Sequence, residues 1–200
     1  MKIKYTNTFY LVLLMVTISS CVKIPKIQMG NNVQQIYSSK AILKNGDILK
    51  MVKKVSECTT TIILVSHAEK MKDQKDPNLT KEGNMRAEKL KDILSTISLN
   101  QIYSSDYNRT QQTAKPTSNA QGIKVTSYNP RALNEFGNMV VETKEGENIL
   151  VVGHSNTTPV LLNYFMKEEI VKSISESDYG NLYVINIDKK KQAKTLILRF

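Results

Sequence analysis

The stretch Thr61-Ile62-Ile63-Leu64-Val65-Ser66-His67-Ala68-Glu69-Lys70 is an unbroken apolar, β-branched run that stops abruptly at a histidine. Such a run is typical of a buried strand in a parallel sheet, where apolar layers cover both faces. The run places His67 at the carboxyl end of its strand, which is the edge where open α/β sheets bind ligands. The sequence therefore predicts a central strand that delivers a histidine to a site.

The same design returns later in the chain, where the run 149–156 ends in His154. Between the two runs, the segment 101–110 places Arg109 just after a short strand, at the start of a helix. The carboxyl ends of parallel strands share one edge of a sheet, so we expect His67, Arg109 and His154 to converge there. The alternative to a functional site is a structural one, in which the two histidines merely cap neighbouring strands.

Four ordered motifs run through this part of the chain. They read S-H-A-E at 66–69, L-T-K-E-G-N-M-R-A at 79–87, S-D-Y-N-R-T-Q-Q-T-A at 105–114 and G-H-S-N-T at 153–157. Together they resemble the histidine phosphatase superfamily, also called phosphoglycerate-mutase-like, from about Thr61 to the C-terminus. One position departs from the family pattern, because Ser66 stands where the first phosphate-binding arginine is expected.

The resemblance implies a role for each site residue. His67 would be the nucleophile that forms a phosphohistidine, which water then cleaves. Arg109 would bind two phosphate oxygens with its planar fork of donors, and His154 would donate to the same oxygens. Asn156 would line the pocket next to Thr157, for which helix capping is an equally good explanation.

Ser66 weakens the expected phosphate site. A serine hydroxyl supplies one neutral hydrogen bond, and charge-assisted bonds are roughly twice as strong. Loss of a transition-state donor commonly costs about 2.7 to 4 kcal/mol, on the order of a hundred- to a thousand-fold in rate. Lys70 could restore a positive charge, although it cannot reproduce the arginine fork, and a solvated loop lysine is the alternative.

The general acid is the second uncertain part of the site. Leu133-Asn134-Glu135 matches the carboxylate segment of the mutase branch, and Glu135 is therefore the candidate acid. Without a carboxylate acid, the reaction favours substrates with good leaving groups, such as phosphoramidates. The motifs leave no cluster of acidic and histidine side chains for a metal, so we expect neither a metal nor another cofactor.

Alternating strands and helices predict the architecture. Thr80 can cap a helix whose apolar stripe includes Ala87 and Leu94, and strands near 102 and 123 alternate with helices near 109 and 130. This order predicts an α/β fold: a three-layer α/β/α domain with a mostly parallel sheet. The runs 182–187 and 195–198 predict a C-terminal antiparallel hairpin or edge strand.

The connection between Arg109 and His154 is short. It holds only one strand, one helix and connectors, so the cap insertion of the mutase branch is absent. We therefore expect an open, shallow site like that of the short phosphohistidine-phosphatase-like members. Its partner would be a small phosphorylated substrate or a phosphoprotein.

The N-terminus has the pattern of a bacterial lipoprotein signal. Lys2 and Lys4 precede a short apolar region, and small residues precede Cys21, so residues 1–20 would be removed and Cys21 lipidated. An uncleaved anchor helix or an ordinary secretory signal is the alternative. Lipidation would anchor the protein to a membrane in the bacterial cell envelope, outside the cytoplasm.

Residues 21–46 are polar and lack sustained periodicity, which indicates a tether. Asp47 could cap a helix with apolar positions at Ile48, Met51, Val52 and Val55, so the folded domain would span residues 47–200.

The composition suits a single domain of ordinary size. The chain has 200 residues and a net charge of +10, which falls to +8 without Lys2 and Lys4. A basic surface favours anionic substrates or headgroups. Scattered lysines and only four arginines, without interleaved aromatic residues, argue against nucleic acid as a partner. Lipidation of Cys21 would leave Cys58 without a disulfide partner.

Three hypotheses of function follow. The first is a phosphatase that acts through phosphohistidine on His67, weakened by Ser66. The second is a catalytically inactive lipoprotein that keeps the fold and serves as an anion-binding or scaffolding module. The third is a purely structural envelope lipoprotein, which explains none of the motifs.

Overall fold

The computed structural model of the protein describes residues 26–51, 59–72 and 75–200. Cys21 and the predicted signal lie outside these residues, as does Cys58. Within them, no helix is both long enough and apolar enough to cross a membrane.

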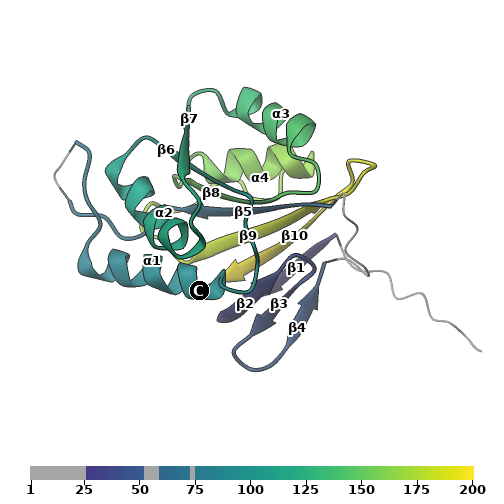
Figure 1. The fold of residues 1–200 in the computed structure, drawn as a ribbon, viewed down its shortest axis with the longest axis horizontal. Coiled ribbons are helices and arrows are strands. Elements are labelled where there is room, and N and C mark those ends of the chain that lie inside the picture. Colours follow the sequence, from purple (N-terminus) through teal and green to yellow (C-terminus); the bar gives the residue numbers. More distant parts are fainter. Residues whose placement is uncertain (1–25, 52–58, 73–74) are drawn as a thin grey trace, which may run out of the picture.

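A seven-stranded sheet forms the centre of the protein, in the order β1-β10-β9-β5-β8-β6-β7 (Figure 1). Its strands are β1 (Ile27–Gly30), β5 (Thr60–Ser66), β6 (Gln101–Ser105), β7 (Val125–Tyr128), β8 (Asn148–Gly153), β9 (Asn181–Ile187) and β10 (Ala193–Arg199). The neighbours β5, β8, β6 and β7 are parallel, whereas β9 runs antiparallel to both β5 and β10. The sheet is therefore mostly parallel, as predicted.

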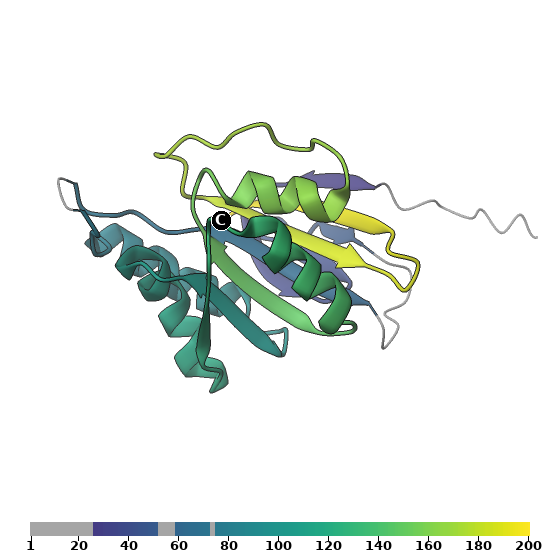
Figure 2. The same ribbon diagram turned by 90° about the horizontal axis from the view of Figure 1, so that it is seen from above.

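In the part of the chain that the structure describes, four helices lie on the two faces of this sheet. They are α1 (Lys81–Ile93), α2 (Asn108–Gln121), α3 (Leu133–Thr143) and α4 (Thr158–Met166). Helices α1 and α2 lie on one face and α3 and α4 on the other (Figures 1 and 2). The three-layer α/β/α prediction is confirmed.

The central strand β5 shows why both faces need a cover. Ile63 and Val65 belong to the apolar cluster with α1, whereas Ile62 and Leu64 belong to the cluster with α3 and α4. All four side chains are at most 1 % exposed. Alternate side chains point to opposite faces, so an uninterrupted apolar run places apolar side chains on both.

The C-terminal hairpin is also confirmed, and its position is more central than an edge. Strand β9 pairs with β5 over Thr60–Val65, and β10 lies outside β9. The edge of the sheet on this side is β1, which pairs parallel to β10, and the opposite edge is β7.

Residues 27–50 differ from the sequence prediction. In place of a polar tether and a helix from Asp47, the chain forms β1 and a separate three-stranded sheet of β2 (Val33–Tyr37), β3 (Lys40–Leu43) and β4 (Ile48–Lys50). Val33, Ile36 and Ala41 pack into the α1-side core. A register shift between Val33 and Gln35 breaks the period of two, so the sequence shows no sustained strand pattern.

The helix predicted over residues 47–55 is wrong for the part that the structure describes. Ile48 to Lys50 form a strand, and residues 52–55 lie outside the description. The i, i+3 spacing of the apolar residues Ile48 and Met51 is the spacing expected on one face of a helix. In the structure, however, Ile48 is half exposed while Met51 is buried.

Candidate active site

His67 follows β5 directly and is 3 % exposed. Its backbone N–H donates to the Gly153 carbonyl over 3.0 Å, which joins the ends of β5 and β8. The ring Nδ1 donates to the Ala68 carbonyl oxygen at 2.9 Å, since that oxygen can only accept. This contact fixes the tautomer and leaves a lone pair on Nε2.

The charge state of His67 suits a nucleophile. Burial lowers its pKa below the ordinary value, and the positive charges of Arg109 and Lys70 lower it further, against the opposing effect of the Ala68 carbonyl. The imidazole is therefore neutral at pH 7.

His154 follows β8 and lies beside His67, with ring centroids 5.6 Å apart. An Arg109 Nη2–H donates to its Nδ1 over 3.3 Å, so the proton is on Nε2, which contacts the Ser105 hydroxyl at 2.8 Å. Burial, followed by the charge of Arg109 and the proximity of His67, lowers the pKa of His154 to about 4.

Arg109 lies in the first turn of α2, next to His154 and to Asp76 of the neighbouring loop. Its guanidinium lies over the Tyr107 ring, 4.6 Å from the centroid, and Nη1 is 3.5 Å from the Asp76 carboxylate. Its Nε is buried and has no hydrogen-bond partner within the described part of the chain. An unsatisfied buried donor of a cation is suited to an anionic ligand.

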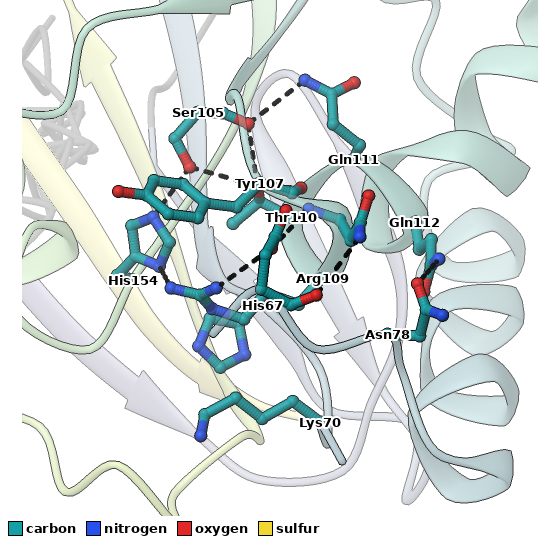
Figure 3. A network of polar contacts seen from close by, with 12 residues as sticks. His67, Lys70, Asn78, Ser105, Tyr107, Arg109, Thr110, Gln111, Gln112 and His154 are labelled. Atoms are coloured by element: carbon teal, nitrogen blue, oxygen red, sulfur yellow. Dashed lines mark hydrogen bonds and ion pairs between the residues drawn. The ribbon is translucent and has the colours of Figure 1, made fainter. Parts of the chain in front are cut away.

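These three side chains point toward one another at one end of the sheet (Figure 3). They line a cavity of about 500 Å³ that is open to solvent. The other lining residues are Tyr107, Pro130, Arg131, Ser155, Asn156, Thr157 and Glu176. The convergence of His67, Arg109 and His154 is therefore as the sequence predicts.

Ser66 does not line the cavity. Its side chain is buried, and its hydroxyl donates to the Thr158 hydroxyl at the start of α4, over 3.2 Å. The position that carries an arginine in the family motif thus supplies no cation to the anion site.

Glu135 is exposed on α3 and lines an adjacent surface pocket, which shares Pro130 and Arg131 with the site cavity. The carboxylate that lines the site cavity belongs to Glu176, and its Oε1 lies 3.8 Å from Lys70 Nζ. Glu135, the sequence candidate for the general acid, is therefore not among the residues that line the cavity of the two histidines.

The remaining sequence candidates surround the cavity. Asn156 is exposed on its wall, whereas Thr157 is buried and its hydroxyl accepts the His154 backbone N–H at 3.0 Å. Lys70 is partly buried, and its positive charge lowers the pKa of His67.

Sequence reasoning missed Tyr107, Arg131 and Glu176. Each lies in a loop or at a helix start, where no periodic pattern marks a function. Tyr107 stood within a quoted motif, and its ring packs edge-on against His154 at 5.1 Å. Arg131 follows Asn129-Pro130 after β7, the position of a site loop in a parallel sheet.

Further residues of the motifs fix the loop that carries His67. Glu69 binds Arg86 of α1, with carboxylate to Nη2 at 2.6 Å, and its carbonyl accepts the Thr80 N–H at 2.9 Å. A Cβ on Gly83 would lie 2.1 Å from that carbonyl oxygen. The glycine of the second motif therefore allows α1 to approach the His67 loop.

No group of three or more His, Cys, Asp or Glu side chains in residues 26–51, 59–72 and 75–200 is arranged to hold a metal ion.

Comparisons with known proteins agree with this geometry. The profile of the histidine phosphatase superfamily (branch 1) matches residues 59–139. No curated protein matches the chain.

Several solved structures share the fold. The alpha-ribazole phosphatase of Shigella flexneri is 15 % identical with a TM-score of 0.59, covering 70 % of this chain and 96 % of that one. A mycobacterial glucosyl-3-phosphoglycerate phosphatase is 12 % identical with a TM-score of 0.56, covering 70 % and 97 %. An Agrobacterium tumefaciens protein named as the phosphohistidine phosphatase SixA is 21 % identical with a TM-score of 0.53, covering 68 % and 94 %.

The chain thus matches histidine phosphatase superfamily branch 1 over residues 59–139, and it has the fold of these phosphatases.

Proposed function

We propose that the protein is a phosphatase that hydrolyses phosphoric monoesters or phosphoramidates through a phosphohistidine on His67. One observation carries the proposal: a neutral His67, with its proton held on Nδ1, lines the same cavity as Arg109 and His154. A neutral imidazole nitrogen with a free lone pair is the species that attacks phosphorus.

The reaction has two steps. His67 Nε2 forms a bond to phosphorus while the bond from phosphorus to the leaving oxygen or nitrogen breaks. Water then attacks the phosphohistidine, which releases phosphate and restores His67. Arg109 stabilises the equatorial oxygens in both steps, and its Nε is a donor without a protein partner within the described residues.

His154 acts as an anion-responsive donor in this mechanism. In the free site its Nδ1 accepts from Arg109, so it offers no proton there to a phosphate. A bound dianion raises the pKa of a neighbouring imidazole. His154 then takes up a proton at Nδ1, and this N–H donates a hydrogen bond to the phosphate. Substrate binding and proton uptake are therefore coupled.

Good leaving groups are the preferred substrates. Glu135 does not line the cavity, and Glu176 is largely exposed, with 73 % of its side chain accessible. Little internal proton donation is thus available to a poor leaving group. A small phosphorylated molecule or a phosphoprotein can enter, because the chain from Arg109 to His154 holds only α2, β7, α3 and β8 with short connections, and it contains no cap insertion. We propose on this basis that the protein belongs to the short, cap-less, phosphohistidine-phosphatase-like branch.

The site of action follows from the N-terminal pattern. A lipidated Cys21 would hold the domain at a membrane surface of the bacterial cell envelope, outside the cytoplasm. The support is the sequence of residues 1–21, which precedes the described part of the chain.

The test is hydrolysis of an aryl phosphate by the full-length protein in detergent, compared with His67→Ala. The proposal expects the variant to lose activity by at least about a thousandfold, since it removes the nucleophile. Circular dichroism checks that the variant is folded. Equal rates for the two proteins would exclude His67 as the nucleophile.

A second function, an inactive anion-binding or scaffolding lipoprotein, is favoured by Ser66 alone. Serine stands where the family motif has an arginine, so the phosphate site lacks that cation. The Ser66 hydroxyl donates to Thr158 instead. This protein would bind phosphate without forming phosphohistidine.

A further inference from the structure

Arg131 differs from the other three arginines of the chain. Those three are paired with carboxylates: Arg86 with Glu69, Arg109 with Asp76 and Arg199 with Asp178. Arg131 forms no ion pair with any residue that the structure describes, and it lines the cavity of His67, Arg109 and His154. The family motifs assign it no role. An unpaired guanidinium on a cavity wall is suited to an anionic ligand, because its fork matches a carboxylate or a phosphate.

The sheet places Arg131 across the cavity from His67. The strand order β5-β8-β6-β7 arranges the site loops in the order His67, His154, Arg109 and Arg131. Neighbouring strands are about 4.8 Å apart, so β5 and β7 are separated by roughly 14 Å at their ends. In this order the loop of Arg131 is the site loop furthest from His67, and it lies next to the loop of Arg109.

The loop that carries Arg131 has a defined conformation. Asn129 Oδ1 accepts the Arg131 backbone N–H at 3.0 Å, and Pro130 restricts the residue between them. Just before this turn, Tyr128 stacks on Phe136 of α3 with ring centroids 4.5 Å apart. Arg131 is thus presented on the cavity wall by a turn that is anchored to the core.

The charges at the two ends of the cavity differ. Glu176 is the only acidic residue among those seen to line it, and it lies near Lys70 and lowers the positive potential at His67. At the other end Arg131 lines the cavity with Pro130, and the adjacent surface pocket that it shares with Glu135 lies outside this cavity. Lys70 is paired with Glu176, whereas Arg131 has no ion pair with Glu135 or another described residue, so the Arg131 guanidinium is the better partner for a second negative charge.

We propose that Arg131 binds a second anionic group on the substrate, carried by the leaving group. In an in-line displacement the leaving group departs opposite the nucleophile, which is the Arg131 side of the cavity. The substrate class is then a phosphate ester or phosphoramidate whose leaving group bears a carboxylate or another phosphate. This inference rests on the proposed function for the place of the leaving group, and its test requires no turnover.

The experiment compares two phosphonates by isothermal titration calorimetry with the full-length protein in detergent at constant ionic strength. Phosphonopropionate carries a carboxylate, and propylphosphonate has a methyl group in its place. The wild type should bind phosphonopropionate about tenfold more tightly, as expected for one charge-assisted contact. Arg131→Gln should abolish this preference and leave the affinity for propylphosphonate unchanged.

A matched control removes one positive charge elsewhere. Lys124 is exposed, and it is absent from the cavity wall, so Lys124→Gln should keep the tenfold preference. The proposal is overturned if Arg131→Gln keeps the preference, or if the wild type shows none. It is equally overturned if Arg131→Gln weakens both phosphonates alike, which would make Arg131 a ligand of the phosphoryl group itself.

The two proposals can fail separately. If the preference depends on Arg131 but His67→Ala hydrolyses aryl phosphates as fast as the wild type, the catalytic proposal fails and the Arg131 site stands. If His67 is essential for hydrolysis but Arg131→Gln keeps the preference for phosphonopropionate, the Arg131 proposal fails and the catalytic proposal stands.

Discussion

His67 and His154 are neutral because both rings are buried beside a guanidinium. Their exposed fractions are 3 % and 8 %, and Arg109 lies within hydrogen-bonding distance of His154. Burial is the largest cause of the lowered pKa of each ring, and the positive charge of Arg109 acts in the same direction. In the free site the charge that attracts an anion is therefore that of Arg109, because neither imidazole is protonated.

The lowered pKa of His154 makes stability depend on pH. Its pKa is about 4 in the folded protein and 6.5 ordinarily, so between these values the unfolded chain binds a proton that the folded chain does not. Stability is thus fully present above pH 6.5 and is lost as the pH falls toward 4. Between pH 7 and pH 4.5 the loss attributable to His154 is about 2 kcal/mol. Urea unfolding at pH 7 and pH 4.5 measures it.

His154→Gln provides the comparison, because glutamine does not titrate. The variant should lose less stability than the wild type between the two pH values, while the carboxylates contribute equally to both. An identical loss in the two proteins would show that the folded-state pKa of His154 is not depressed.

Ser66→Arg tests whether the missing arginine limits the rate. Rebuilding the charged clamp should raise the hydrolysis rate of an aryl phosphate on the order of a hundredfold, since one transition-state donor commonly contributes that much. Ser66→Ala removes only the hydrogen bond to Thr158 and should leave the rate nearly unchanged. If a folded Ser66→Arg protein gains nothing, the scaffolding function becomes the better account.

The sequence predicts the central site residues because they follow regular strands. His67 and His154 end apolar runs, and those runs are neighbouring parallel strands. Arg131 and Glu176 lie in irregular loops, whose path depends on tertiary contacts that no local pattern encodes. The direction of the Ser66 side chain likewise depends on Thr158, which is 92 positions away.

At the level of elements, α1 and the His67 loop form one unit. Thr80 caps α1 by accepting the Gly83 N–H at 3.1 Å, and its own N–H donates to the Glu69 carbonyl. Arg86 then binds the Glu69 carboxylate and, over 2.8 Å, the Phe200 carbonyl oxygen. The helix thereby holds the chain that follows the nucleophile.

Gly83→Ala should disturb this unit. A Cβ would lie 2.1 Å from the Glu69 carbonyl oxygen, so the helix must shift away from the loop. We expect a loss of about 1 to 3 kcal/mol in the free energy of unfolding, despite the higher helix propensity of alanine. Urea denaturation measures the loss, and the hydrolysis rate should fall with it.

Lys81→Ala is the matched control, because Lys81 is exposed in the same turn of α1. Its unfolding free energy should stay within about 0.5 kcal/mol of the wild type. If Gly83→Ala is as stable as Lys81→Ala, the close approach of α1 to Glu69 is not a constraint.

The elements themselves are predictable where one pattern runs long enough. Strand β5 is a continuous β-branched run, and the stripe of Ala87, Leu90 and Leu94 marks α1 and the turn that follows it. Strand β4 has three residues, and β2 contains a register shift, so neither shows a full period. Val33 and Ile36 of β2 pack in the same apolar cluster as α1, and Leu49 of β4 packs against that cluster, which is a tertiary effect.

For the molecule as a whole, two covered sheet faces leave the carboxyl ends of the parallel strands as the place for a site (Figure 2). The chain carries a net charge of +10. A basic protein attracts both anionic substrates and anionic lipid headgroups. This charge is compatible with an enzyme held at a membrane surface.

Cys21→Ser should separate the protein from the membrane. In the proposed lipoprotein Cys21 would accept the lipid, and several acyl chains anchor far more stably than one. The variant should move to the soluble fraction or remain unprocessed, as followed by cell fractionation and radioactive palmitate labelling. Cys58→Ser is the control and should stay in the membrane fraction. If Cys21→Ser fractionates and incorporates label like the wild type, the lipoprotein proposal is lost.

The most direct test of the catalytic proposal is detection of phosphate on His67 during turnover. Rapid quenching in alkali with a labelled aryl phosphate, followed by mass spectrometry of the peptides, should find acid-labile, alkali-stable phosphate on His67. His154→Gln should retain the phosphate attachment site, whereas His67→Ala should lack it. Hydrolysis without any phosphate on His67, or with phosphate on another residue, would contradict the mechanism.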